Sequence, residues 1–177
     1  MRKIIVAATF AVAALFSAGT ANAQTATQDI NISATVASYC TINNITNPAA
    51  LTASIPVTNG IVDTTVINTT VASVACNNAA DVRATSVTGG VTPGGAAASG
   101  TTNIIDYTGV ATFGGASSTI NTATTATAAG NELGNLATTA SAATGNLTVT
   151  ITPAQPALPL QPSLAYADTL RVTLVAQ

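Results

Sequence analysis

The sequence predicts an all-β fold, and three features of the chain indicate it. Thr, Val and Ile, whose branched side chains suit an extended backbone, recur throughout the 177 residues. Several stretches alternate apolar and polar residues, whereas no stretch has the 3.6-residue period of a helix. Only 6% of the residues are charged, which is unlike a disordered chain. We expect one β domain with a thin core, because much of its apolar content is alanine.

The first 23 residues have the order of a secretory signal peptide. Met1–Lys3 is a basic head, Ile4–Phe16 is an apolar run broken by one Thr, and Ala21–Ala23 is a small-x-small cleavage site. The apolar run is shorter than the roughly 20 residues that span a bilayer. We therefore expect residues 1–23 to be removed and the protein to be exported.

The residue composition argues against several classes of function. Without residues 1–23, Arg83 and Arg171 stand against six acidic residues, a net charge of −4. A chain without a basic patch is not expected to bind nucleic acid. It contains no His, so the commonest general base and the Ser-His-Asp and Cys-His arrangements are missing. We expect no catalytic residues, cofactor, metal site or small-molecule substrate.

After the expected cleavage site, Asp29–Val36 alternates strictly over eight residues. The apolar side chains that share one face of the extended strand are Ile30, Ile32, Ala34 and Val36. Two interpretations stay open at this point. The stretch is either the first strand of its own domain or a strand that pairs with a neighbouring molecule.

Cys40 and Cys76 are the two cysteines of the chain. One pair in an exported protein predicts a disulfide, and two Cys without His cannot complete a tetrahedral metal site. Cys76 ends the β-branched run Ile61–Cys76, which is long enough for one long strand or two strands with a bend. We expect Ala72 and Val74 to share the inward face with Cys76.

The segments on either side of Cys76 also have clear signals. Asn59-Gly60 is typical of a tight turn before the long run. A further strand is expected over residues 81–88. Asp81 and Arg83 lie two residues apart on it, which predicts a solvated surface pair of little energetic value.

A tract rich in Gly, Ala, Ser and Thr then runs to about residue 145. Only Ile104–Tyr107 and Val110–Phe113 carry enough bulk to pack. We expect Ala96–Thr102 and Gly114–Ala143 to be mostly loops or weak outer strands.

The C-terminal part alternates again. Residues 146–152 place Leu147, Val149 and Ile151 on one face, and the four prolines that follow favour an extended loop. The final strand places Leu170, Val172 and Leu174 on one apolar face.

Together these features resemble the spore coat U type of subunit, from the archaic chaperone–usher pili. The resemblance rests on the alternating strand before Cys40, on Cys76 closing a Val-rich strand, and on Ile151–Gln155 followed by Tyr166–Leu174. It implies an incomplete immunoglobulin-like β-sandwich that a donor strand from a neighbouring subunit completes. The expected division is a signal peptide (1–23), a donor-strand extension (24–38) and one pilin-like domain (39–177).

The resemblance also implies roles and partners. Ile30, Ile32, Ala34 and Val36 would form the donor strand, and Tyr166, Leu170, Val172 and Leu174 the groove and its closing strand. The partners would be identical or related pilin subunits, a periplasmic chaperone and an outer-membrane usher. The protein would pass through the periplasm to the cell surface as a pilus subunit, for adhesion or biofilm formation. The alternative is a self-contained secreted β protein, either an adhesin or a Thr/Ala-rich surface-binding protein.

Overall fold

The structure, a computed structural model, describes residues 32–43, 51–124, 132–162 and 165–177. The chain divides into two units, Met1–Thr35 and Val36–Gln177, and every described strand belongs to the second. The expected signal peptide and Ile30 lie outside the described residues. None of the described residues is helical, and none forms a helix that could cross a membrane.

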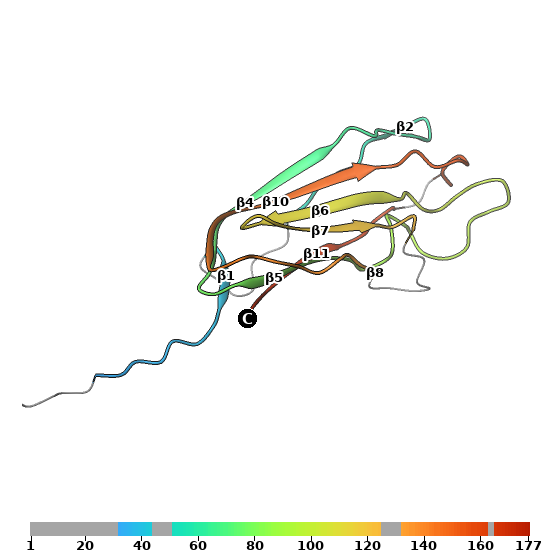
Figure 1. The fold of residues 1–177 in the computed structure, drawn as a ribbon. Helices are drawn as coiled ribbons and strands as arrows, with labels where there is room; N and C mark the ends of the chain where they lie inside the picture. The colour runs from blue at the N-terminus through green and yellow to red at the C-terminus, as the bar shows by residue number, and fades with distance from the viewer. Residues whose placement is uncertain (1–31, 44–50, 125–131, 163–164) are drawn as a thin grey trace, which may run out of the picture. The chain divides into compact units, whose positions relative to one another are not determined.

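The second unit is built from antiparallel strands (Figure 1). The strands are β1 (Cys40–Ile42), β2 (Val57–Thr58), β3 (Ile61–Val62), β4 (Ile67–Cys76), β5 (Ala80–Ser86), β6 (Tyr107–Phe113), β7 (Ala116–Asn121), β8 (Glu132–Leu133), β9 (Ala137–Thr138), β10 (Ala143–Pro153) and β11 (Leu170–Ala176). One sheet has the order β1-β4-β10-β6-β7, and the other has the order β11-β5-β8, with β9 also pairing β5. The strands β2 and β3 form a separate hairpin.

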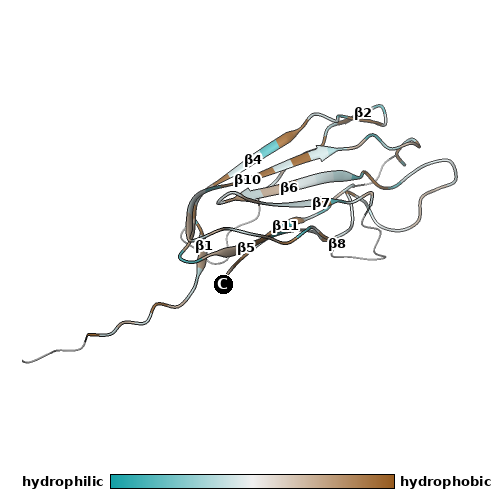
Figure 2. Ribbon diagram, in the orientation of Figure 1, coloured by the Kyte–Doolittle hydropathy of each residue, from teal (hydrophilic) through white to brown (hydrophobic). Residues whose placement is uncertain are grey.

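The two larger sheets enclose one apolar core. It contains the fully buried side chains of Val74, Val82, Phe113, Ile120 and Leu147, which come from strands of both sheets. Apolar and polar residues alternate visibly along β4 and β10 (Figure 2), because successive side chains of a strand point to opposite faces. The architecture is an all-β sandwich, and this part of the predicted fold class is confirmed.

A β-bulge in β4 corrects one expectation from the sequence. Val71 pairs with Leu147 and Val74 with Gly145, so two residues of β4 oppose one residue of β10. Ala72 and Ser73 are both exposed, and Ser73 has a φ of 56°. A bulge shifts the inward face by one residue. The prediction of a shared inward face is therefore right for Val74 and Cys76 but wrong for Ala72.

The central tract contributes more to the core than its composition suggested. A two-residue turn, Gly114-Gly115, joins β6 to β7, and both glycines have positive φ, 55° and 82°. A Cβ at Gly114 would lie 2.7 Å from the Cβ of Ala143, so this turn also requires a glycine sterically. The next strand, β7, buries Ile120. The expectation of loops or weak strands fits the two-residue strands β8 and β9 but underestimates β7.

Other local expectations are confirmed. Asn59 and Gly60 have φ values of 53° and 76° in the turn between β2 and β3. The expected run from residue 61 to residue 76 forms two strands, β3 and β4. Pro153 is the last residue of β10, which corrects the loop predicted for the four prolines, whereas Pro156, Pro159 and Pro162 lie in no strand. The final alternating stretch is β11.

Candidate functional site

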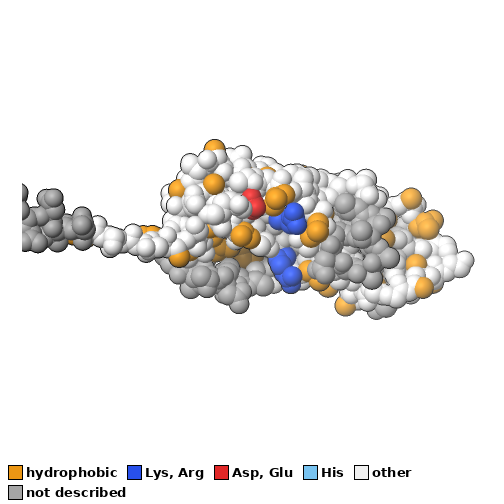
Figure 3. Space-filling model, turned by 60° about the horizontal axis from the view of Figure 1, so that its bottom comes forward, with side chains coloured by type: hydrophobic (Ala, Val, Ile, Leu, Met, Phe, Trp, Pro, Cys, Tyr) orange, Lys and Arg blue, Asp and Glu red, His pale blue; other side chains and the backbone are white. Residues whose placement is uncertain are grey.

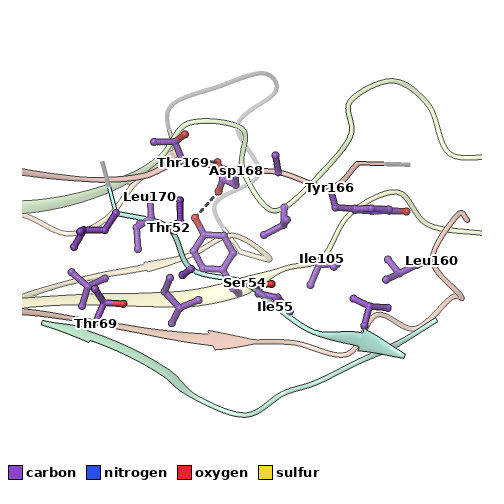
Figure 4. A pocket seen from close by; sticks show the side chains of 18 of the residues that line it. Thr52, Ser54, Ile55, Thr69, Ile105, Leu160, Tyr166, Asp168, Thr169 and Leu170 are labelled. Carbon is purple, nitrogen blue, oxygen red and sulfur yellow. Dashed lines mark hydrogen bonds between the residues drawn. The ribbon is translucent and has the colours of Figure 1, made fainter. Parts of the chain in front are cut away.

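An elongated cavity of about 1120 Å³ lies inside the sandwich, between the inner face of the first sheet and β11. Val71, Leu147 and Val149 contribute apolar side chains from β4 and β10, and Leu170 and Val172 contribute them from β11. Figure 4 shows these walls together with the segment that carries Thr52, Ser54 and Ile55. The lining is mainly aliphatic, which suits an apolar occupant.

Two strand edges beside this cavity lack a partner strand among the described residues. β11 pairs with β5 along one edge only and ends its sheet. β1 pairs with β4 only from Val74 to Cys76, so the same edge of β4 is open from Ile67 to Ala72. Unpaired edges present backbone N–H and C=O groups that another strand can bind. The cavity therefore offers both apolar surface and backbone hydrogen-bonding groups to an extended segment.

The inward side chains of β11 are incompletely covered. Leu170, Val172 and Leu174 pack against the core cluster, yet each is only partly buried. The equivalent side chains of β5, Val82 and Ala84, have no exposed surface. Leu170 and Val172 line the cavity, whereas Leu174 shares their face but does not line it. The sandwich is thus less well covered along β11 than along β5.

A smaller apolar cluster closes the other end of the cavity. Val62, Ile105 and Leu160 are buried there, and Tyr166 packs against them. The hydroxyl of Tyr166 donates to backbone carbonyl oxygens of Gln161, at 3.0 Å, and of Thr102, at 3.3 Å. Tyr166 thus helps to form the end wall of the cavity.

Asp168 is the carboxylate in the cavity lining, and it accepts several hydrogen bonds. Its carboxylate accepts hydrogen bonds of 2.6 Å from the hydroxyls of Ser86, Thr88 and Tyr107. The bond from Tyr107 is the dashed line that reaches Asp168 from a tyrosine ring in Figure 4. Burial would raise the pKa of the Asp168 carboxyl, but the hydrogen bonds from these groups outweigh it and lower that pKa. An ionised Asp168 therefore ties the start of β11 to β5 and β6.

The disulfide between Cys40 and Cys76 is present, with a Cα–Cα distance of 4.1 Å, which confirms its prediction. It joins β1 to the end of β4. Ile42, the last residue of β1, and Asn43 after it line the cavity, so the disulfide anchors one end of the site. A disulfide is consistent with an exported, non-cytoplasmic protein.

The residues expected to form the donor strand are exposed where they are described. The exposed fraction is 91% for Ile32 and 76% for Val36, and Ala34 is also exposed. Residues 32–39 form no strand, turn or bend. Val36, which belongs to the second unit, does not line the cavity.

Sequence reasoning identified the face of β11 and Tyr166 but missed other parts of the site. Leu160 and residues 51–55 reach the cavity from loops, whose position no alternation pattern encodes. Ile105 also lines it, and the sequence had indicated only that its segment was bulky enough to pack. Asp168 is a single acidic residue just before the alternating strand 170–174, and that position was the one sign in the sequence that it could hold the strand in place. Among the described residues, no group of three or more His, Cys, Asp or Glu could hold a metal ion. Comparison of the chain with family models, with characterised proteins and with solved structures found no match.

Proposed function

We propose that this protein is the structural subunit of an extracellular pilus and that it polymerises by donor-strand exchange. Residues 29–36 of one copy would enter the cavity of the next copy and complete its sandwich. The observation that carries the proposal is an apolar cavity flanked by the open edges of β4 and β11. β-strand addition of this kind combines main-chain hydrogen bonds with pockets for alternate side chains.

The length and pattern of the donor segment suit the cavity. Asp29–Val36 has eight residues and β11 has seven, so the two can pair along nearly their whole length. One face of the donor segment is entirely apolar. It would contact Leu170 and Val172, whose apolar side chains line the cavity. Burying Ile30, Ile32 and Val36 would stabilise the complex by roughly 1.5–3 kcal/mol each. A shift by one residue would turn the polar face inward, so the register is well specified.

The path of the chain into β1 favours pairing between molecules. Ser38 donates a hydrogen bond of 2.9 Å to the backbone oxygen of Gln177, at the C-terminal end of β11. Asn77 holds Ala37 and Tyr39 through side-chain hydrogen bonds of 2.9 and 2.8 Å. The chain continues through Cys40 into β1, whose last residue, Ile42, lines the cavity, and residues 36–39 contain no turn.

An unfilled cavity with open edges would be an aggregation hazard. This motivates two further partners, a periplasmic chaperone that covers the cavity before assembly and an outer-membrane usher. Adhesion or biofilm formation would be the role of the assembled fibre.

The test compares two single substitutions in the donor segment. Ile32→Asp places a charge on the apolar face, and the matched control Asn31→Asp places the same charge on the polar face. We expect Ile32→Asp to abolish heat-labile, SDS-resistant oligomers while the subunit still co-purifies with its chaperone. Asn31→Asp should assemble normally.

A self-contained domain gives a different result. If residues 29–36 were the domain's own first strand, Ile32→Asp would misfold the monomer, and both the oligomers and the chaperone complex would be lost. That outcome would favour the secreted β adhesin or surface-binding protein.

A further inference from the structure

The outer face of the second sheet carries both basic side chains of the described residues. Arg83 lies on β5, where its neighbours Val82 and Ala84 point into the core, so Arg83 points outward. Arg171 on β11 pairs with Thr85, and Thr173 pairs with Arg83. The two arginines are therefore diagonal neighbours on one face, with the roughly 7–8 Å spacing of such positions. Figure 3 shows basic side chains gathered on this face among hydrophobic ones.

One described carboxylate, that of Asp81, lines the same shallow cavity as the two arginines. Asp81 lies on the same face, but its carboxylate accepts hydrogen bonds of 2.6 Å from the Thr138 hydroxyl and the Gln177 side-chain amide. It shares this face with Arg83, as expected, but forms no ion pair with it. The Nε atom of Arg83 is buried without a hydrogen-bond partner. A buried donor without an acceptor costs free energy, and a ligand on the outer face would not reach this atom.

The arginines border a shallow cavity of about 460 Å³ with an apolar rim. Leu133, Leu136 and Val175 line it, and each leaves about half of its surface exposed, at 52%, 50% and 52%. Thr173 adds a hydroxyl to the lining. A ligand that fits this cavity would combine negative charge with hydroxyl groups and C–H surface.

We propose that this face is a binding site for an acidic polysaccharide that carries carboxylate groups. Guanidinium groups bind carboxylates through two parallel hydrogen bonds, and two neighbouring arginines can hold successive carboxylates of one polymer. The C–H faces of the sugar rings would pack on Leu133, Leu136 and Val175, and sugar hydroxyls would bond Thr173. The rest of the described surface has no other basic side chain, so a polyanion is attracted only here. The site uses neither the cavity beside β11 nor the donor segment, so it stands apart from the proposed assembly.

The test measures binding of the exported protein to immobilised polygalacturonate at low salt. Neutral dextran and poly-glutamate serve as comparison surfaces. We expect the double variant Arg83→Gln/Arg171→Gln to bind polygalacturonate about tenfold or more weakly than the unchanged protein, because charge-assisted hydrogen bonds are lost. The control Asp63→Asn changes the net charge by one at a different, exposed position and should bind as the unchanged protein does. Equal thermal unfolding of the variants checks that each is folded.

Three results would overturn the proposal. The first is that polygalacturonate is bound no better than dextran, and the second is that the double variant binds as the unchanged protein does. Equal or stronger binding of poly-glutamate would show that the face recognises acidic peptide rather than polysaccharide.

Discussion

Asp168 joins β11 to β5 and β6, because its carboxylate accepts hydrogen bonds from Ser86, Thr88 and Tyr107. The same carboxylate also accepts backbone hydrogen bonds from Thr88 and Thr169. This one side chain therefore fixes where β11 begins and how the wall of the cavity is held.

We predict that Asp168→Asn lowers the free energy of unfolding by about 2 kcal/mol, because the ionised acceptor is lost. Denaturant unfolding of the purified protein at neutral pH measures this. The matched control is Asp63→Asn, since Asp63 is fully exposed and its carboxylate bonds only to Thr65. Equal stability of the two variants would contradict a role for Asp168 in holding β11.

The same carboxylate predicts a dependence of stability on pH. The pKa of Asp168 is lowered in the folded protein from an ordinary value of 3.8. A lowered pKa contributes stability above the ordinary pKa, and this contribution is lost as the pH falls through the folded-state value. We expect the free energy of unfolding to fall below about pH 4 more steeply for the unchanged protein than for Asp168→Asn. Parallel pH profiles would show that Asp168 does not contribute.

At the scale of the element, β11 is the strand on which the cavity depends. Its inward residues Leu170 and Val172 line the cavity, while Arg171 and Thr173 point to the outer face. Neighbouring positions of one strand thus serve two different surfaces, because the side-chain period is two.

We predict that Val172→Asp abolishes accumulation of the protein, whereas Thr173→Asp does not. The first places a charge on the partly buried inner face, where it lacks a partner, and the second places it on the exposed face. Immunoblotting of exported protein measures the difference. Normal export and assembly of Val172→Asp would contradict the assignment of β11 as the closing strand of the cavity.

At the scale of the whole molecule, the thin core makes the disulfide important. Several buried core positions are alanine, among them Ala80, Ala84 and Ala111, which bury little apolar area. The bridge closes a loop with a sequence separation of 36. Because such a loop has less conformational freedom when unfolded, the bridge stabilises the fold by about 4 kcal/mol, against roughly 5–15 kcal/mol for a whole domain.

We therefore predict that Cys40→Ala/Cys76→Ala lowers the free energy of unfolding by about 4 kcal/mol. Denaturant unfolding of the variant and of the unchanged protein measures the difference. The mass of the unchanged protein, kept unreduced, should show the loss of two hydrogens that the disulfide requires. A reduction below about 1 kcal/mol would mean that the bridge matters little to stability.

The sequence by itself determined the alternating strands β10 and β11 and the covalent bridge. Alternation over residues 146–152 and 170–174 set which side chains face inward, since the period of a strand is a local property. The single cysteine pair determined the disulfide in the same direct way.

Only the tertiary structure decided the rest, because it depends on which distant segments pair. The bulge at Ala72 and Ser73 arises from the register between β4 and β10, which no local pattern encodes. The distant partners of Asp168 come from two separate segments, one with Ser86 and Thr88 and one with Tyr107. Arg83 lies near Arg171 only because β5 pairs with β11. The open edges of β4 and β11 likewise follow from the strand order, because among the described residues no further strand pairs with them there.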